Sequence, residues 1–356
     1  MKAFIDLSAL SRNLSKIQQL AGTKNIIAMV KANAYGHGLI PVTRFLESQG
    51  VKYFGVATIE EGEQLRASGT QSAILLMSGA GLVDAPERVW AARLTPLISS
   101  IAELDALESL GHEMAVHIDL DTGLSRGGLP ISEVFQVIEW FTHQKRRVKL
   151  EGLSTHFANA ETANCAFSKI QLALFEQALA DFELAGLKPS MIHVAKSSAI
   201  VNHFNHPNSW ARPGIALYGA YDGFEPVLSL QAPITLIKTL KIGDTVGYHQ
   251  TWKASRETKI ALIRAGYGDG YPRVLSNQGH ALLHGMRVPI IGRISMDLMT
   301  LDITGLSPKI GDTVTLMGRE QQEQITAEQL ASACDTISYE ILTRLTERVE
   351  RIPLIE

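Results

Sequence analysis

The chain has 356 residues, which is too long for one ordinary hydrophobic core and about right for two domains. Apolar residues make up 46% of it and charged residues 19%, so the composition is that of a globular protein rather than a disordered one. The net charge of -3 gives no support to a nucleic-acid-binding surface.

The first residues and the cysteines indicate the compartment. Residues 1–6 lack the apolar segment of a signal peptide, and Asp6 follows almost at once. No stretch approaches the roughly 18 apolar residues that a membrane helix needs. Cys165 and Cys334 lie far apart without a C-x-x-C spacing, so we expect free thiols with neither a disulfide nor a metal role. We therefore predict a cytoplasmic protein without membrane or nucleic-acid partners.

Strands and helices alternate over about the first two hundred residues. The predicted strands are residues 4–7, 26–30, 53–57, 73–77, 94–98, 114–120, 148–155, 191–195 and 214–218. The predicted helices begin after Ser8 as an N-cap and continue with residues 41–50, 59–68, 101–110, 132–144 and 166–185. This alternation indicates parallel βα units, and about eight of them suit a closed (β/α)8 barrel of the TIM type. A doubly wound open sheet is the alternative, because periodicity alone does not show closure.

The pattern changes after Phe224, where helical periodicity gives way to short alternating runs separated by Gly-Asp turns. The predicted strands here are residues 234–240, 259–263, 281–283, 288–291, 299–303 and 314–316, followed by an amphipathic helix at 339–349. The sequence K-I-G-D-T-V occurs at 241–246 and again at 309–314, which we interpret as two similar turns in one β domain. We predict an α/β barrel domain at 1–224 and an all-β domain at 225–356, with the first strand as a possible member of the second.

Residues 26–38, I-I-A-M-V-K-A-N-A-Y-G-H-G, organise the chain. The continuous apolar run predicts a strand buried on both faces. Lys31 stands at the end of that strand, and Tyr35 follows in the next loop. A lysine beside an apolar strand loses hydration, so its neutral amine becomes more accessible. That is what a lysine needs in order to form a Schiff base with a carbonyl compound.

Four other basic residues stand where predicted strands end. Arg126 lies in D-T-G-L-S-R-G-G after the strand that carries His117 and Asp119, and His156 ends G-L-S-T-H. His193 opens H-V-A-K-S-S, and Arg212 begins R-P-G-I. In a barrel, functional residues gather at the C-terminal ends of the strands, so these side chains are expected to converge.

V-K-A-N-A-Y-G-H-G resembles the lysine motif by which alanine racemases bind pyridoxal 5'-phosphate (PLP), and the other motifs match that family in order to the C-terminus. The resemblance implies that Lys31 holds PLP and is one of two catalytic bases. Arg126 would bind the substrate carboxylate with its planar fork. His156 and Arg212 would also contact the cofactor. The implied phosphate ligands are Tyr35, Ser197, Gly214, Ile215 and Tyr339, with Ser198 next if the register shifts by one.

The position of Arg212 bears on the reaction type. The resemblance places it at the pyridine nitrogen, where most PLP enzymes have a carboxylate. An arginine donates a hydrogen bond there without giving up its proton, which favours reprotonation at the α-carbon over transamination. The family's hydrogen-bond network implies links from Tyr248 through His156 and Arg212 to His193, in which a histidine beside a permanent cation stays neutral.

Racemisation needs a second base on the face opposite Lys31. The resemblance gives this role to Tyr248 in V-G-Y, whose ordinary pKa near 10 requires tuning. In the family this tyrosine enters the site of the other subunit, together with Tyr267 in G-Y-G-D-G-Y and Met296-Asp297 in R-I-S-M-D. The implied protein is therefore a homodimer with shared active sites, which converts L-alanine to D-alanine for peptidoglycan.

Two positions depart from the family pattern. Many members carry a carbamylated lysine where this chain has Asp119. We expect Asp119 to pair with Arg126 directly and to make CO2 unnecessary. His249 follows Tyr248 where small residues are common, which leaves strict selectivity for alanine open.

Three alternatives remain at this stage. A PLP homeostasis protein shares the barrel but lacks a β domain and the opposing tyrosine. A barrel-type PLP decarboxylase has a carboxylate at the pyridine nitrogen, in contrast to Arg212. A broader racemase that acts on serine or lysine is often exported, and no export signal is evident here.

Overall fold

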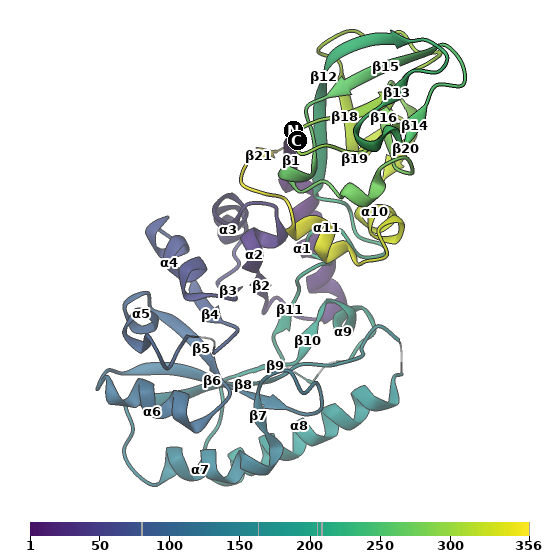
Figure 1. The fold of residues 1–356 in the computed structure, drawn as a ribbon. Coiled ribbons are helices and arrows are strands. Elements are labelled where there is room, and N and C mark those ends of the chain that lie inside the picture. Colours follow the sequence, from purple (N-terminus) through teal and green to yellow (C-terminus); the bar gives the residue numbers. More distant parts are fainter. Residues whose placement is uncertain (80, 163, 205, 208, 356) are drawn as a thin grey trace. The chain divides into compact units, whose positions relative to one another are not determined.

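The computed structural model describes residues 1–79, 81–162, 164–204, 206–207 and 209–355. The chain forms two compact units (Figure 1). One contains residues 11–34 and 39–217, and we call it the barrel unit. The other contains residues 1–10, 35–38 and 218–356, and we call it the β-rich unit. Within the described residues, no helix has the length and apolarity required to cross a bilayer.

The barrel unit is built on parallel strands. Their order is β2 (Ile27–Met29), β3 (Tyr53–Val56), β4 (Ala73–Leu76), β5 (Leu94–Ile98), β6 (Met114–Asp121), β8 (Val148–Thr155) and β9 (Met191–His193). The short β7 (Leu129–Pro130) pairs with β6, and β10 (Ala195–Lys196) pairs with β11 (Ala211–Arg212). Ala211 also bridges Ile26 in parallel, and the Trp210 N–H donates to the Ile192 carbonyl at 2.7 Å. These two contacts bring the last strand back to the first.

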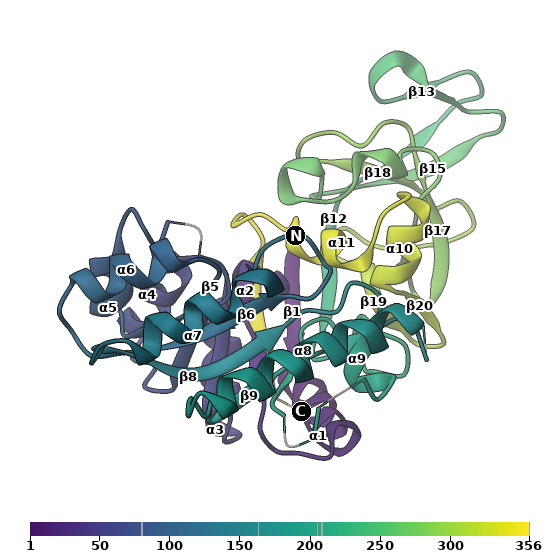
Figure 2. The same cartoon turned by 90° about the horizontal axis from the view of Figure 1, so that it is seen from below.

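Helices follow the strands along the outer side of this sheet (Figure 2). They are α3 (Leu39–Ser48), α4 (Ile59–Ala67), α5 (Pro86–Ala91), α6 (Ile101–Ser109), α7 (Val134–Thr142), α8 (Ala166–Leu184) and α9 (Ser197–Val201), after α1 (Leu7–Ala21) and the turn α2 (Lys31–Tyr35). Thr58 and Ser100 cap α4 and α6 by accepting the N–H groups of Glu61 and Glu103. The strands between are apolar on both faces, as Ile74, Leu75 and Leu76 show by being fully buried.

The β-rich unit has a nine-stranded sheet. Its order is β20 (Glu323–Ile325), β19 (Thr313–Glu320), β16 (His280–Leu283), β17 (Met286–Ile291), β18 (Met299–Asp302), β15 (Thr258–Ile263), β12 (Leu228–Leu240), β1 (Lys2–Asp6) and β21 (Glu350–Leu354). Because β12 pairs with β19 as well as with β15, the strands from β19 to β12 close on themselves. A small pair, β13 (Thr245–Val246) and β14 (Trp252–Lys253), and the helices α10 (Ala327–Ala333) and α11 (Ser338–Thr343) complete the unit.

The predicted fold class, an α/β barrel of the TIM type followed by a β-rich domain, is confirmed. One predicted strand is wrong: residues 214–218 form a turn, in which the Leu217 N–H donates to the Gly214 carbonyl, and the last strand is β11 instead. Helix α1 begins at Leu7 because Asp6, and not Ser8, accepts the Ala9 N–H at 2.8 Å. Helix α11 ends at Thr343, earlier than predicted, and the Arg351 guanidinium donates to the carbonyls of Leu345 and Thr346 beyond its end.

Candidate active site

A cavity of about 490 Å³ opens at the C-terminal ends of the barrel strands. Four residues selected from the sequence line it: Lys31, Asp119, Arg126 and His156. Its other walls come from the loops after β3, β4 and β5, among them Ala57, Met77 and Ser99. The barrel therefore brings together residues that lie up to 125 positions apart in the chain.

Lys31 follows β2 and begins a left-handed turn. Ala32, Asn33 and Ala34 have φ of 53°, 54° and 53°, a conformation that costs an L-residue roughly 1–2 kcal/mol. Two side chains hold the turn: the Ala32 N–H donates to Glu61 Oε1 at 2.6 Å, and the Leu39 N–H donates to Asn33 Oδ1 at 2.7 Å. The Lys31 ammonium is thus presented by a strained but anchored backbone.

Glu61 links this turn to the next strand. Its other carboxylate oxygen accepts the Ala57 N–H at 2.8 Å, just after β3. Burial lowers the pKa of Lys31, the neighbouring Arg126 and Arg212 lower it further, and Glu61 opposes them. The T-x-x-E spacing of Thr58 and Glu61 is a capping signal, so the sequence could have marked Glu61 as a helix start but not as a support for Lys31.

We expect Glu61→Gln to lower the pKa of Lys31 further, because the substitution removes the one charge that raises it. In protein freed of cofactor, acylation of Lys31 by a pulse of acetic anhydride should set in at lower pH than in the unchanged protein, as measured by mass spectrometry. Glu63→Gln is the matched control, since Glu63 lies on the same helix but pairs with Arg88. Identical labelling curves for the two variants would remove this role of Glu61.

Arg212 is buried on β11 at 4% exposure. Its Nη2 donates to the Thr155 carbonyl at 2.6 Å and lies 3.4 Å from His156 Nδ1. Its Nε has no hydrogen-bond partner among the described residues. Burial lowers the pKa of Arg212 to about 10, so the side chain stays charged at neutral pH. Burial and the adjacent Arg212 lower the pKa of His156 to about 2, which leaves that imidazole neutral.

His193 belongs to a separate chain of hydrogen bonds. Its Nε2 lies 2.7 Å from His117 Nδ1, and His117 Nε2 lies 3.2 Å from Glu151 Oε2. His117 reaches across because the neighbouring strand has Gly152 beside it, where a Cβ would stand 2.5 Å from His117 Nδ1. A carboxylate only accepts, so His117 donates to Glu151 and accepts from His193 Nε2. His193 Nδ1 is then the unprotonated nitrogen of a neutral ring, buried and without a hydrogen-bond partner among the described residues. The sequence did not predict the part that Glu151 plays.

Asp119 and Arg126 do not form the predicted ion pair. Asp119 accepts a hydrogen bond from Ser154 Oγ at 2.6 Å, and Arg126 is exposed, with no ion pair inside the described ranges. Ser154 stands directly opposite Asp119 in the register of β8 against β6, a proximity that sequence spacing does not show. Burial raises the pKa of Asp119, while Arg212 and then Arg126 act against that rise. The carboxylate therefore interacts with both arginines by electrostatic attraction at a distance rather than by a hydrogen bond.

We expect Asp119→Asn to raise KM for alanine by about tenfold, or ~1.4 kcal/mol. The substitution keeps the Ser154 hydrogen bond but removes the negative charge that attracts Arg126. Initial rates at varied alanine concentration measure this, with and without added bicarbonate. The unchanged protein should not respond to bicarbonate. An unaltered KM in the variant would show that other groups hold Arg126.

The predicted phosphate ligands fall into two sets. In the barrel unit, Ser197 Oγ accepts the N–H groups of Gly214 at 3.0 Å and Ala216 at 3.2 Å, on either side of Ile215, whereas Ser198 donates to Glu161. In the β-rich unit, the rings of Tyr35 and Tyr339 lie 5.9 Å apart, and burial raises the pKa of Tyr35. Because Ser197 Oγ accepts both backbone N–H groups, its own hydroxyl hydrogen is left to donate to a phosphate, and the tyrosine hydroxyls are donors of the same kind.

These groups fit PLP on three observations. Lys31 offers an amine of lowered pKa, Arg212 has a buried N–H without a partner in the described residues, and Ser197, whose Oγ accepts two backbone N–H groups, has its hydroxyl hydrogen left to donate. Such an orphaned donor costs free energy unless a ligand accepts from it. The barrel unit is therefore chemically suited to an aldehyde that also carries a ring nitrogen and a phosphate.

The remaining predicted residues belong to the β-rich unit. Tyr248 begins the 3-10 turn η2 (Tyr248–Gln250) at 67% exposure, and Tyr267 begins η3 (Tyr267–Asp269) at 39%. Met296 is 52% exposed, and the adjacent Asp297 is exposed as well. All four side chains are accessible on a single chain, which suits residues that contact another molecule.

Known proteins match nearly the whole chain. Residues 5–222 match the family model for the alanine racemase N-terminal domain, and residues 227–353 match that for the alanine racemase C-terminal domain. The alanine racemase of Syntrophobacter fumaroxidans is 37% identical over 95% of this chain and 93% of its own. That of Cutibacterium acnes is 35% identical over 98% and 96%.

Solved structures agree with the sequence comparison. Alanine racemase from D-cycloserine-producing Streptomyces lavendulae matches with a TM-score of 0.92 and 31% identity, over 99% of this chain and 96% of that one. Alanine racemase from Bartonella henselae, described with covalently bound pyridoxal phosphate, matches with a TM-score of 0.86 and 31% identity over 99% of both chains.

Proposed function

The chain belongs to the alanine racemase family along nearly its whole length, and we infer from this membership that it interconverts L-alanine and D-alanine with PLP as its cofactor. The observation that carries the inference is the barrel cavity, which is lined by Lys31, with the cations Arg126 and Arg212 near its amine. The chain around it matches both family domains. The protein is accordingly an isomerase.

We propose the following binding roles. Lys31 holds PLP, and Arg212 Nε and His156 contact its ring. The phosphate is bound by five residues: Ser197, Gly214, Ile215, Tyr35 and Tyr339. Arg126 binds the substrate carboxylate, and Asp119 and His193 support the two arginines. The distances around Ser197 and Arg212 and the position of Lys31, Arg126 and His156 on one cavity support these assignments.

PLP, when bound, withdraws electrons from a substrate amine and so makes the α-proton acidic. The chain's own part is to move that proton. Arg212 stays charged and keeps its proton, so it donates a hydrogen bond without serving as an acid. Lys31, with its lowered pKa, is able to act as a base on its own face of the substrate.

A second base must lie on the opposite face, and we propose Tyr248 from a second copy of the chain. Its exposure and its place in the β-rich unit support this choice. The active form is then a homodimer with two shared sites, to which Tyr267, Met296 and Asp297 also contribute. We further propose the domain division 1–224 and 225–356, which lies between the two family matches.

The cellular role is proposed as supply of D-alanine for peptidoglycan in the cytoplasm, where free thiols such as Cys165 and Cys334 are usual. A racemase of wider range that also acts on serine is the second candidate. The feature that favours it is His249, which follows Tyr248 where small residues are common in the family.

The test is incubation of the purified protein with L-alanine or L-serine in D2O. Chiral chromatography and mass spectrometry should show L-alanine approaching an equal mixture of enantiomers, with deuterium at the α-carbon of the product. Equal rates for serine would establish the wider range. Retention of pure L-alanine without deuterium would reject the assignment.

A further inference from the structure

Two exposed loops of the β-rich unit lie against each other. The Tyr267 N–H donates to the Ser295 carbonyl at 3.1 Å, and the Gly268 N–H donates to the Met296 carbonyl at 2.8 Å. Glycine at 266 permits this approach, because a Cβ there would stand 2.3 Å from the Met296 carbonyl oxygen. The loop that carries Tyr267 and the loop that carries Met296 and Asp297 are therefore one structural element.

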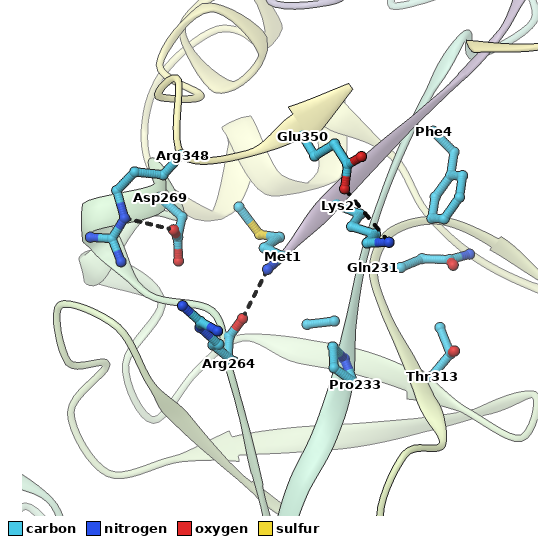
Figure 3. A pocket seen from close by; sticks show the side chains of 11 residues that line it. Met1, Lys2, Phe4, Gln231, Pro233, Arg264, Asp269, Thr313, Arg348 and Glu350 are labelled. Atoms are coloured by element: carbon cyan, nitrogen blue, oxygen red, sulfur yellow. Dashed lines mark hydrogen bonds and ion pairs between the residues drawn. The ribbon is translucent and has the colours of Figure 1, made fainter. Parts of the chain in front are cut away.

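Arg348 joins the two loops through their carboxylates. Its Nη2 donates to Asp297 Oδ1 at 2.5 Å, and its Nε lies 3.4 Å from Asp269 Oδ1, as Figure 3 shows for the second contact. Asp269 is 8% exposed at its side chain, and its other oxygen accepts the Gly266 N–H at 3.0 Å. Gly268 leaves room for the guanidinium, since a Cβ there would stand 2.5 Å from Arg348 Nη1.

The chain around Arg348 is itself fixed to the same loop. The Thr346 N–H donates to the Asp269 carbonyl at 3.2 Å, and its hydroxyl donates to the Gly268 carbonyl at 3.0 Å. Arg351 in turn binds the Thr346 carbonyl at 2.7 Å. The backbone next to Arg348 is thus held by several hydrogen bonds, although the Arg348 side chain itself is 46% exposed.

We propose that Arg348 is a positioning residue, which holds Tyr267 and Asp297 in the arrangement that enters the active site of a second copy of the chain. The inference rests on the proposed shared-site dimer. The Arg348–Asp297 pair is exposed on both sides and contributes little to folding stability by itself, and the buried Asp269 keeps its hydrogen bond from the Gly266 N–H when Arg348 is removed. A residue that joins two exposed loops of the β-rich unit is instead placed to fix the shape of the trans-acting surface.

Arg348→Ala should raise KM for alanine and lower kcat/KM by about tenfold, with a much smaller change in kcat, because the loops lose their register while both bases remain. Thermal unfolding should change little. Arg348→Lys should recover part of the loss, since an ammonium pairs with one carboxylate but lacks the fork for two. Arg256→Ala is the control: Arg256 forms one exposed ion pair with Asp302 in the same unit, and its loss should leave the kinetics unaltered.

A mixing experiment assigns the effect to the partner's site. Arg348→Ala protein is unfolded, mixed with Lys31→Ala protein and refolded together. Each mixed dimer then has one site with an intact Lys31 and intact loops from the other chain. Assayed at alanine well below KM, where the Arg348→Ala homodimer has about a tenth of normal activity, the mixture should recover about a quarter of normal activity, because about half of the dimers are mixed and each has one complete site of two.

The same mixture made with Tyr248→Phe in place of Arg348→Ala separates the two ideas. At the same low alanine concentration, recovery with Tyr248→Phe but no more activity than unmixed Arg348→Ala protein with Arg348→Ala would overturn the role of Arg348 and leave the shared-site dimer intact. If neither mixture recovers activity, the shared-site dimer itself is wrong. Unchanged KM in the Arg348→Ala homodimer would also overturn the inference.

Discussion

Lys31→Ala should slow the interconversion of alanine enantiomers by about 10⁴-fold or more, the largest loss expected for any single substitution. The variant loses both the amine that holds the cofactor and one of the two bases. The surrounding fold should persist, because the left-handed turn is anchored by backbone contacts to Glu61 and by the Asn33 side chain rather than by the lysine. Rates measured by chiral chromatography would test this.

Two further readouts distinguish the chemistry from a folding defect. Borohydride should fix PLP to the unchanged protein at Lys31, as located by peptide mass spectrometry, and should fix none to the variant. A small primary amine such as methylamine should restore part of the activity by supplying the missing base. Lys52→Ala, which removes an exposed lysine before β3, serves as the control. Substantial activity in Lys31→Ala without added amine would contradict the assignment.

The sequence predicted the parallel strands well because most of them contain a short apolar run, as at residues 26–30 and 73–77, and helices α4 and α6 also begin after recognisable caps, Thr58 and Ser100. It failed at residues 214–218, where apolar residues after Pro213 resemble a strand but form a turn whose N–H groups serve Ser197. Helix α5 was missed, since its six residues are too short for a helical period to be visible. In the β-rich unit, periodicity located strands but not their order, which depends on pairings between distant segments.

The same distinction applies to the site. Lys31, Arg126 and His156 stand at strand ends, and strand ends meet at one face of a barrel, so topology alone predicts that they converge. The expected pair of Asp119 with Arg126 failed because Ser154, its neighbour in strand register, is closer. Three further residues contact partners that lie far from them in the sequence: Glu61, Glu151 and Arg348. A single sequence carries no signal for such contacts.

Tyr248→Phe should reduce racemisation by about 10²–10⁴-fold, because one face of the substrate loses its acid–base group while Lys31 continues to serve the other. The variant should still exchange the α-proton of one alanine enantiomer for deuterium without inverting it. Chiral analysis of deuterium content in D2O separates the two processes. Tyr53→Phe is the control, since Tyr53 packs edge-on against Trp210 outside the cavity.

Mixing gives this prediction a result that no single chain can produce. Tyr248→Phe and Lys31→Ala proteins are each nearly inactive, but a mixed dimer combines an intact Lys31 from one chain with an intact Tyr248 from the other. About a quarter of normal activity should return, and the recovered activity should show inversion as well as exchange. An inactive mixture would mean that Tyr248 serves its own chain or none. The exposure of Tyr248 at 67% on an isolated chain would then need another explanation.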